Sequence, residues 1–396
     1  MPIERGFSDC PNMWAVRIIL FVLFNVVERS FCMRVILSGG GTGGHINPAL
    51  SIAGYIRNIE KDSEILFVGT KRGLESSLVQ KENFPIKYVD VEGLKTSLSF
   101  KNIKSLMKFA KAISKCKKII KDFKPDIVIG TGGYVCAPVV YAANKLGIPT
   151  IIHEQNVFPG SAIKFLSKKS SVTAISFDES RKYLQDAKEI LTVGNPIRPA
   201  ILKVDRNDSR KKLGLGTEKF IVVFGGSLGA KKINDVVAEY LASLNDDNIK
   251  VCFATGERDY DRVMEKLGAS ISRNIDVRKY IHNMDEVLSA SDLVICRSGA
   301  MTVSELCVLG RPSILIPSPN VTHNHQEYNA RALSDIGAAR IILEKDFDTD
   351  TLKREIENCF ESDISLSAMS EKADSLKMTD ASDMIYIKAK ELIAKK

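Results

Sequence analysis

Residues 34–45 read Arg34-Val35-Ile36-Leu37-Ser38-Gly39-Gly40-Gly41-Thr42-Gly43-Gly44-His45, and the rest of the chain is organised around them. An apolar strand runs directly into a turn that contains five glycines. Glycine lets the backbone approach a ligand closely, and the start of a helix offers unpaired N–H groups to an anion. We therefore predict a site for a phosphate or for polar substrate atoms at this turn.

A helical pattern follows the turn. We expect Asn47 to cap this helix and Pro48 to take its first position, because both residue types are favoured there. His45 closes the turn, and it is the side chain in this stretch that can transfer a proton near neutral pH.

The spacing Gly39-x-Gly41-x-x-Gly44 also fits the turn of a dinucleotide-binding Rossmann fold. Such a fold requires an acidic residue at the end of its second strand to bind the ribose. The second apolar run, 65–71, ends without a carboxylate, so a dinucleotide site is the weaker interpretation. A P-loop is excluded, because no Gly-Lys-Ser/Thr closes the turn.

The composition limits the class of protein. A length of 396 residues predicts two domains, and a net charge of +8 favours an anionic partner such as a nucleotide, a phospholipid surface or a nucleic acid. The eight cysteines lack paired metal-ligand spacing and mostly fall in apolar patterns, which indicates buried free thiols in a reducing compartment. His323 and His325 are the one close histidine pair, which is too little to predict a metal site.

Residues 1–32 differ from the remainder of the chain. The apolar run at 13–27 is interrupted by Arg17 and Asn25 and is shorter than the roughly 20 residues of a membrane-spanning helix. It also lacks the basic start and the cleavage site of a signal peptide. We expect 1–32 to lie outside the fold, with Met33 as the true start of the protein or, alternatively, with a leader that associates with a membrane.

From Met33 onward strand-like and helix-like patterns alternate, which predicts α/β layers around parallel sheets. In the first half we expect strands at 34–38, 65–69, 86–90, 126–130, 149–152, 172–175 and 190–193. Loops beyond the carboxyl ends of parallel strands form the ligand crevice of such folds. The turns at 39–44, 131–134 and 153–156 should therefore meet above the sheet, although His153 is equally well explained as a hydrogen-bonded loop histidine.

Residues 101–124 contain nine lysines and a single acidic residue, Asp122. Apolar residues at helical spacing give this segment an amphipathic pattern. Two interpretations stay open. The segment is either a core-packed helix with a solvated lysine face, or its basic face lies against anionic lipid while the apolar turn at 94–100 enters the headgroups.

The stretch Gly194-Asn195-Pro196-Ile197-Arg198-Pro199 reads as a linker, because a turn and two prolines break the periodicity. After it the opening pattern returns, with a strand at 220–224, a second glycine turn at 225–230 and a helix from about Lys231. Two such units predict two Rossmann-like, doubly wound domains that face each other across a ligand cleft. Further strands are expected near 250–254, 275–278, 292–296 and 313–316.

In the segment 294–306 a buried strand breaks at Ser298-Gly299 and a helix begins, which should end by Gly310. Small residues at its start leave room for a diphosphate over the helix N-terminus. Glu305 would repel a phosphate unless its carboxylate points aside and accepts hydrogen bonds from the two hydroxyls of a ribose. The alternative is a charge that favours the helix dipole.

Together these motifs resemble the GT-B glycosyltransferases, and among them the family of peptidoglycan enzymes that transfer N-acetylglucosamine from UDP-N-acetylglucosamine to lipid I. The matching stretches, in the order of the family, are 40–45, 132–134, 153–156, 194–198, 225–227, 297–305 and 325–330. Residues 1–32 depart from the family pattern. The resemblance implies an extension at 1–32, an acceptor and membrane domain at 33–195, a UDP-N-acetylglucosamine domain at 196–375, and a C-terminal helix at 376–396 that packs back on the first domain.

The resemblance also implies individual roles. The backbone of Ile281 would meet the uracil edge, Glu305 the ribose, and Gln326 the sugar hydroxyls. The diphosphate would lie against Ser227 and the helix start formed by Ala300, Met301, Thr302, Val303 and Ser304. Further donor-site positions of the family are Thr42, Gly43, Gly44, Asn156 and Arg198.

In the family, the C4 hydroxyl of a lipid-linked muramyl-pentapeptide attacks the anomeric carbon of the donor, with inversion to a β1,4 bond. His45 is our candidate for the catalytic base. Many transferases hold a divalent metal at an Asp-x-Asp, but Asp348-Thr349-Asp350 lies far from the glycine turns in the sequence and is interpreted as a helix cap. Helix dipoles and backbone N–H groups can stabilise the leaving UDP, so we predict no metal and no other cofactor.

A lipid acceptor favours the membrane interpretation of 101–124. The resemblance implies a peripheral protein on the cytoplasmic face of the bacterial inner membrane, with UDP-N-acetylglucosamine, lipid I and an anionic membrane surface as partners and no nucleic acid. Three alternatives stay open: a related glycolipid synthase with a diacylglycerol acceptor, a sugar-nucleotide epimerase of GT-B-like architecture, and a protein that binds the nucleotide sugar without turnover.

Overall fold

The computed structural model describes residues 32–92, 100–226, 229–268, 271–361 and 363–396. The predictions for the leader up to residue 31, for the apolar turn at 94–99 and for Ser227 fall outside these residues.

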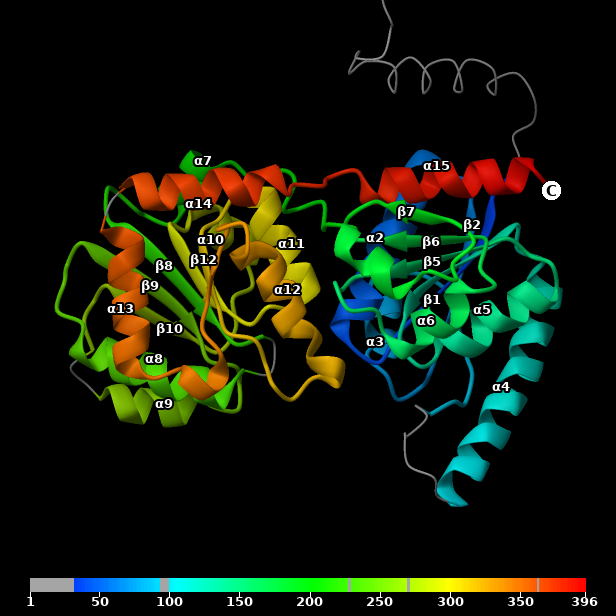
Figure 1. Ribbon diagram of the computed structural model, residues 1–396, viewed down its shortest axis with the longest axis horizontal. Coiled ribbons are helices and arrows are strands. Elements are labelled where there is room, and N and C mark those ends of the chain that lie inside the picture. Colours follow the sequence, from blue (N-terminus) through cyan, green and yellow to red (C-terminus); the bar gives the residue numbers. More distant parts are fainter. Residues whose placement is uncertain (1–31, 93–99, 227–228, 269–270, 362) are drawn as a thin grey trace, which may run out of the picture.

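Two lobes lie side by side, each built on one parallel sheet (Figure 1). The N-terminal sheet has the strand order β3-β2-β1-β4-β5-β6-β7. Its strands are β1 (Arg34–Gly39), β2 (Glu64–Gly69), β3 (Ile86–Tyr88), β4 (Ile127–Gly132), β5 (Thr150–Glu154), β6 (Val172–Ile175) and β7 (Ile190–Thr192). These ranges confirm the predicted strands to within a few residues.

Apolar residues on both faces of this sheet are covered by helices. One face packs against α2 (Gly43–Ile59), α3 (Glu75–Lys81) and the last helix, α15 (Ala381–Ala394). The other face packs against α4 (Phe100–Phe123), α5 (Cys136–Lys145) and α6 (Ser161–Ser167), and the 3-10 turn η1 (Asp178–Tyr183) follows β6. Tyr55 of α2 bonds to Asp383 of α15, and Glu60, directly after α2, bonds to Lys390 of α15, so the end of the chain returns to the N-terminal lobe.

The C-terminal sheet has the strand order β10-β9-β8-β11-β12-β13. Its strands are β8 (Lys219–Phe224), β9 (Ile249–Ala254), β10 (Ile275–Arg278), β11 (Leu293–Cys296), β12 (Ser313–Leu315) and β13 (Arg340–Ile341). The strand order of both sheets is that of doubly wound nucleotide-binding folds, which confirms the predicted fold class. The two-residue edge strand β13 has no counterpart in the prediction, because so short a run carries no periodicity.

Helices also cover both faces of the C-terminal sheet. One face packs against α8 (Lys231–Ser243), α9 (Tyr260–Leu267), α13 (Thr349–Phe360) and α14 (Asp363–Ser375). The other packs against α10 (Met284–Ala290), α11 (Ala300–Leu309) and α12 (His325–Ser334). The remaining elements are α7 (Arg206–Lys212) and the 3-10 turns η2 (Thr322–Asn324) and η3 (Glu344–Asp346).

Three local predictions can be compared with the helix ends. Asp348 accepts a hydrogen bond from the amide of Thr351 (2.8 Å), so its interpretation as a helix cap is confirmed. Gly310 ends α11 in the left-handed conformation (φ +60°), also as predicted. The prediction for Asn47 and Pro48 is wrong. The amides of His45 and Ile46 both bond to the carbonyl of Thr42, so α2 begins at Gly43 and contains Pro48.

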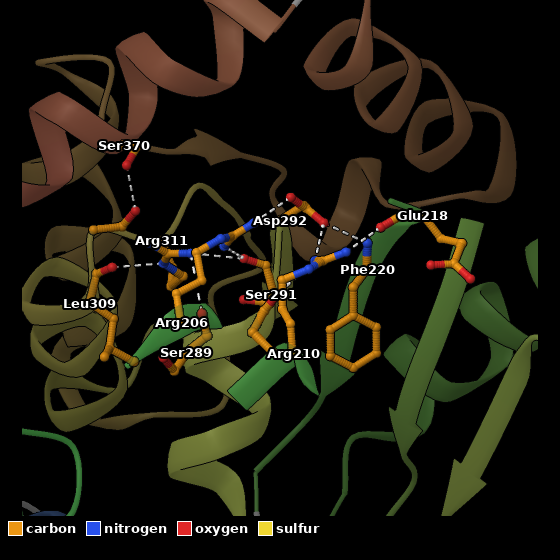
Figure 2. A network of polar contacts seen from close by, with 12 residues as sticks. Arg206, Arg210, Glu218, Phe220, Ser289, Ser291, Asp292, Leu309, Arg311 and Ser370 are labelled. Atoms are coloured by element: carbon orange, nitrogen blue, oxygen red, sulfur yellow. Dashed lines mark hydrogen bonds and ion pairs between the residues drawn. The ribbon is translucent and has the colours of Figure 1, made fainter. Parts of the chain in front are cut away.

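The N-terminal edge of the C-terminal sheet is held by Asp292, which directly precedes β11 (Figure 2). Its carboxylate accepts hydrogen bonds from Arg206 (2.6 Å), Arg210 (3.1 Å) and the amide of Phe220 in β8 (2.7 Å). Arg311 joins this network through backbone carbonyl oxygens, among them that of Ser291 (3.0 Å). The network therefore fixes the end of the sheet opposite to the glycine turn that follows Phe224.

Most cysteines of the described residues lie in the core as free thiols. Cys116, Cys136, Cys252, Cys296, Cys307 and Cys359 are buried free thiols, as predicted from their apolar surroundings in the sequence.

Candidate active site

The lobes contact each other through loops and helices that follow strand ends in both sheets. Asn329 of α12 accepts a hydrogen bond from the amide of Val157 (3.0 Å) and donates one to the side chain of Asn156 (3.1 Å). Asn195, in the linker, donates to the hydroxyl of Ser304 in α11 (2.9 Å). These bonds bring residues 156–157, the linker, α11 and α12 together where the two lobes meet.

The second glycine turn opens on a pocket of about 690 Å³ in the C-terminal lobe. Helices α8 and α11 both begin at this pocket, which is lined by Gly229, Ala230, Gly299 and Thr302. Its other lining residues are Phe224, Gly225, Gly226, Lys231, Lys232, Asp235, Arg297, Ser318, Asn320, Gln326 and Glu344. Two helix N-termini together with lysine side chains make this pocket suitable for an anionic group such as a diphosphate.

Close packing of backbone shapes the glycine turn. Gly229 adopts φ +76°, and a Cβ there would lie 2.1 Å from the carbonyl oxygen of Thr255. A side chain at this position would push the turn away from β9, so glycine is required for the turn to lie where it does.

Gln326 lines the same pocket, at the start of α12. Its side-chain oxygen accepts a hydrogen bond from the amide of Ser318 (2.9 Å), and its carbonyl oxygen accepts one from the hydroxyl of Ser298 (2.8 Å). The side chain is therefore held with its NH2 group as the donor for a ligand, which suits a sugar hydroxyl.

The first glycine turn is different, because the protein fills it with its own carboxylate. Glu75 accepts a hydrogen bond from the amide of Gly41 (3.1 Å) and two from Thr70, through its amide (2.9 Å) and its hydroxyl (2.6 Å). The amide of Gly41 is thus not free for a phosphate or for polar substrate atoms, because it already donates to Glu75. The amides of Thr42, Gly43 and Gly44 stand at the N-terminus of α2.

His45 lies in the first turn of α2 and is half-buried. The hydroxyl of Thr131 donates to its carbonyl oxygen (2.7 Å), and the hydroxyl of Thr42 lies 3.4 Å from its Nδ1. Burial, and to a smaller extent His325 of the other lobe, lower the pKa of His45 to about 4, while Glu75 acts in the opposite direction. The ring is therefore neutral at physiological pH and can accept a proton.

His153 is a structural residue here and not part of the pocket. It is fully buried, its Nε2 lies 2.9 Å from the carbonyl oxygen of Gly194, and its Nδ1 lies 2.9 Å from the side-chain nitrogen of Gln155. The neighbouring Glu154 accepts hydrogen bonds from the amides of Asn156 (2.9 Å) and Gly160 (2.8 Å). These two residues fix the linker and the loop that carries Asn156.

The remaining predicted donor residues of the C-terminal lobe are buried to different depths. Ile281 and Val303 are both buried in one hydrophobic cluster of the C-terminal lobe, so only their backbones are candidates for ligand contact. Ala300 and Met301 form the first turn of α11 with Thr302. Arg198 and Glu305 are joined by two hydrogen bonds (2.7 and 3.0 Å). Of the predicted residues, Thr302 and Gln326 line the pocket itself.

An aromatic cluster also joins the lobes. Phe158 stacks on Tyr328 of α12 (centroids 5.2 Å apart) and contacts Tyr183 (4.7 Å) and His323 (5.4 Å). The ammonium of Lys164 lies 3.8 Å from the centroid of the Phe158 ring. The sequence analysis does not predict this cluster or the role of Glu75, because no local pattern marks contacts between residues so far apart in the chain.

Comparisons with known proteins agree with this geometry. The family model "Glycosyltransferase family 28 N-terminal domain" matches residues 35–175, and "Glycosyltransferase family 28 C-terminal domain" matches 220–385. The chain is 49% identical, over 92% of its length and 99% of the relative, to the UDP-N-acetylglucosamine–N-acetylmuramyl-(pentapeptide) pyrophosphoryl-undecaprenol N-acetylglucosamine transferase of Acetivibrio thermocellus. It is 47% identical, over 89% of its length and 98% of the relative, to the enzyme of the same name from Caldanaerobacter subterraneus. A crystal structure of Acinetobacter baumannii MurG superposes with a TM-score of 0.74 at 29% identity, covering 92% of this chain and 100% of that one.

Proposed function

Because the chain belongs to glycosyltransferase family 28, we propose that it transfers N-acetylglucosamine from UDP-N-acetylglucosamine to the C4 hydroxyl of the muramyl sugar of lipid I, giving lipid II for peptidoglycan synthesis. The chain is a glycosyltransferase. The structural observation that carries the proposal is the pocket at the second glycine turn, where two helix N-termini and a fixed glutamine meet.

The donor would occupy the C-terminal lobe. Its diphosphate would lie over the N-termini of α8 and α11, where backbone N–H groups and the positive ends of the helix dipoles stabilise the charge of the leaving UDP. Gln326 would donate to a sugar hydroxyl, and Glu305 would accept from the ribose. The family positions on the N-terminal lobe, Asn156 among them, would complete the site from across the cleft.

The acceptor would enter from the side of His45. Its C4 oxygen forms a bond to the anomeric carbon as the bond from that carbon to the diphosphate oxygen breaks, and UDP leaves with the electron pair. The neutral ring of His45 takes the proton of the hydroxyl. A base with a pKa of about 4 remains unprotonated over the whole physiological range, so this step would not be limited by its protonation state at neutral pH.

UDP release from UDP-N-acetylglucosamine, measured with and without a lipid I analogue, tests the proposed function. We expect release that depends on the analogue, and a sharp loss of turnover with nearly unchanged UDP affinity in His45→Ala. Diacylglycerol in place of the analogue tests the glycolipid synthase, and conversion of the UDP-sugar without any acceptor tests the epimerase. UDP binding without release in every mixture would contradict an enzymatic role.

We further propose that the enzyme docks on an anionic membrane surface through α4. Among the described residues, no helix has both the length and the apolar character needed to cross a bilayer. Ala112, Cys116 and Ile120 are buried and pack α4 against the N-terminal sheet, as expected for the apolar side of an amphipathic helix. Lys111, Lys115, Lys118 and Lys121 remain exposed on it, as does Lys124 directly after its end. Each lysine near anionic lipid contributes about 1 kcal/mol, so these side chains together support a peripheral association.

Sedimentation with vesicles of anionic phospholipid tests this docking. The triple variant Lys111→Glu, Lys115→Glu, Lys118→Glu should lose most of its vesicle binding, and the wild-type protein should lose it in high salt. A matched control reverses three lysines of the C-terminal lobe, Lys211, Lys266 and Lys353, and should bind as the wild type does. Equal binding by the two triple variants would rule out α4 as the docking element.

A further inference from the structure

We propose that Glu75 is a positioning residue for catalysis, which holds the first glycine turn in shape and stabilises the positive charge that forms on His45 when it takes the acceptor's proton. This inference rests on the proposed function of His45. Glu75 itself would not touch the substrates.

The carboxylate is built into the turn. Glu75 is 1% exposed, and its two oxygens accept three hydrogen bonds, from the amide of Gly41 and from the amide and hydroxyl of Thr70. Burial acts to raise the pKa of Glu75, but the hydrogen bonds from Thr70 and Gly41 outweigh it and keep the pKa below its usual value. The group is therefore ionised at neutral pH although it is enclosed by protein.

Three glycines pack directly on this side chain. A Cβ at Gly40 would lie 2.6 Å from the carboxyl carbon of Glu75, one at Gly73 would lie 2.0 Å from a carboxylate oxygen, and one at Gly69 would lie 2.6 Å from Cγ. The backbone of the turn and that of the loop after β2 thus close around the carboxylate. Removing the carboxylate would leave the amide of Gly41 without its acceptor and release the turn that leads to His45.

The charges around His45 explain why a negative group is needed there. Burial and the His325 ring, which faces it from α12, both disfavour the protonated form of His45. The carboxylate of Glu75 favours that form. Tyr134 also lies beside the turn, with its hydroxyl 3.4 Å from the hydroxyl of Thr70. Of the groups that act on the ring, Glu75 is therefore the one that offsets the cost of the imidazolium.

The charge of Glu75 is needed only while the ring of His45 is protonated. As the C4 oxygen forms its bond to the anomeric carbon, its proton passes to His45, and the electron pair of the broken bond leaves with UDP. The proton stays on His45 and does not continue to Glu75, because the hydrogen bonds from Thr70 and Gly41 favour the ionised carboxylate. Glu75 thus acts through His45, by orientation and by charge.

A double-mutant cycle separates this role from a purely structural one. Glu75→Gln keeps the size of the side chain and removes the charge, and we expect it to lower kcat at least tenfold with little change in the KM for UDP-N-acetylglucosamine, because most of the proposed donor contacts lie on the other lobe. In the His45→Ala background the same substitution should cost less than twofold, because the group through which it acts is gone. Glu75→Asp keeps the charge and should restore part of the lost kcat.

Two outcomes would overturn the inference: an undiminished kcat in Glu75→Gln, or an equal loss of kcat with and without His45. If Glu75→Gln does not fold, as judged by its thermal transition and UDP binding, Thr70→Val takes its place. It removes one hydrogen bond to the carboxylate and should show a smaller loss of kcat, again absent in His45→Ala. A wild-type protein that releases no UDP in response to the lipid I analogue would instead contradict the proposed function, so the two failures are distinguishable.

Discussion

The guanidinium of Arg198 binds the carboxylate of Glu305 through two parallel hydrogen bonds, from Nε to Oε1 at 2.7 Å and from Nη2 to Oε2 at 3.0 Å. Arg198 lies in the linker and Glu305 lies in the second turn of α11, so the pair attaches the linker to the helix that begins at the donor pocket. An ionised carboxylate has about four acceptor positions, and the arginine uses two of them. Two positions remain, which is the number that a ribose diol requires.

Glu305→Gln should therefore weaken UDP binding about tenfold or more. The substitution removes the charge that pairs with Arg198 and replaces one acceptor oxygen by a donor, and hydrogen bonds to charged groups contribute roughly 1.5–3 kcal/mol each. Titration calorimetry with UDP measures the effect without any acceptor. Glu286→Gln is the matched control, since Glu286 pairs with Lys212 at the surface of the same lobe (2.8 Å). Equal UDP affinity in the two variants would argue against Glu305 as a ligand.

Phe158→Ala should loosen the contact between the lobes. Phe158 stacks on Tyr328 across the interface, and such aromatic pairs contribute about 0.5–1.5 kcal/mol beyond the area that they bury. We expect a larger radius of gyration by small-angle scattering and a KM for both substrates raised several-fold at nearly constant kcat. Phe165→Ala is the control, because Phe165 stacks on Tyr141 within the N-terminal lobe and is 51% exposed. If Phe158→Ala scattered and bound as the control does, the cluster would have no part in closure.

Strand positions could be predicted from the sequence because buried parallel strands are short apolar runs between turn signals, as in 34–38 and 220–224. The start of α2 could not. Asn47-Pro48 has the local pattern of a helix start, but the carbonyl of Thr42 already accepts hydrogen bonds from the amides of His45 and Ile46, so the helix begins earlier. The edge strand Arg340–Ile341 exists only through its pairing with β12, which no local pattern reveals.

Much of the candidate site follows from glycine turns and helix starts, which the sequence displays. Its charges do not. The two glycine turns look alike in sequence, yet Glu75 fills one from a separate segment and the other opens on the pocket. Likewise, His153 follows the predicted strand at 149–152 as a site residue would, but it lies in β5 and its ring is buried against the linker. Contacts between residues far apart in the chain determine which glycine turn is open and where the His153 ring lies, and no local sequence pattern predicts such contacts.

The buried His153 predicts a loss of stability in mild acid. Burial lowers its pKa to about 4, below the value of about 6.5 that an unfolded chain has. Between these two values the unfolded chain binds a proton that the folded protein does not, so the free energy of unfolding falls as the pH falls through this window. One such group accounts for at most about 3 kcal/mol. Urea midpoints between pH 7 and pH 4.5 measure the slope.

His153→Gln should flatten that slope while lowering stability at pH 7, because it removes the titrating ring and disturbs the bond to Gly194. His45 and His325, whose pKa values are also lowered mainly by burial, would keep part of the slope in the variant. His282→Gln serves as the control, since His282 is exposed. A slope as steep in His153→Gln as in this control would show that His153 does not contribute.

Asp292→Asn should destabilise the C-terminal lobe by about 3 kcal/mol and leave UDP binding unchanged. One carboxylate serves Arg206, Arg210 and the amide of Phe220, so neutralising it leaves two partly buried guanidinium groups without their counter-charge (Figure 2). The nearby Arg311, whose pKa burial and Arg206 lower to about 10, shows that further positive charge is already unfavourable here.

Urea denaturation measures the loss, and Asp178→Asn, at an exposed ion pair with Arg181, should cost less than 1 kcal/mol. UDP affinity should not change, because Asp292 lies at the end of the sheet away from the pocket; a weaker affinity in the folded variant would mean that the two ends of the sheet are coupled.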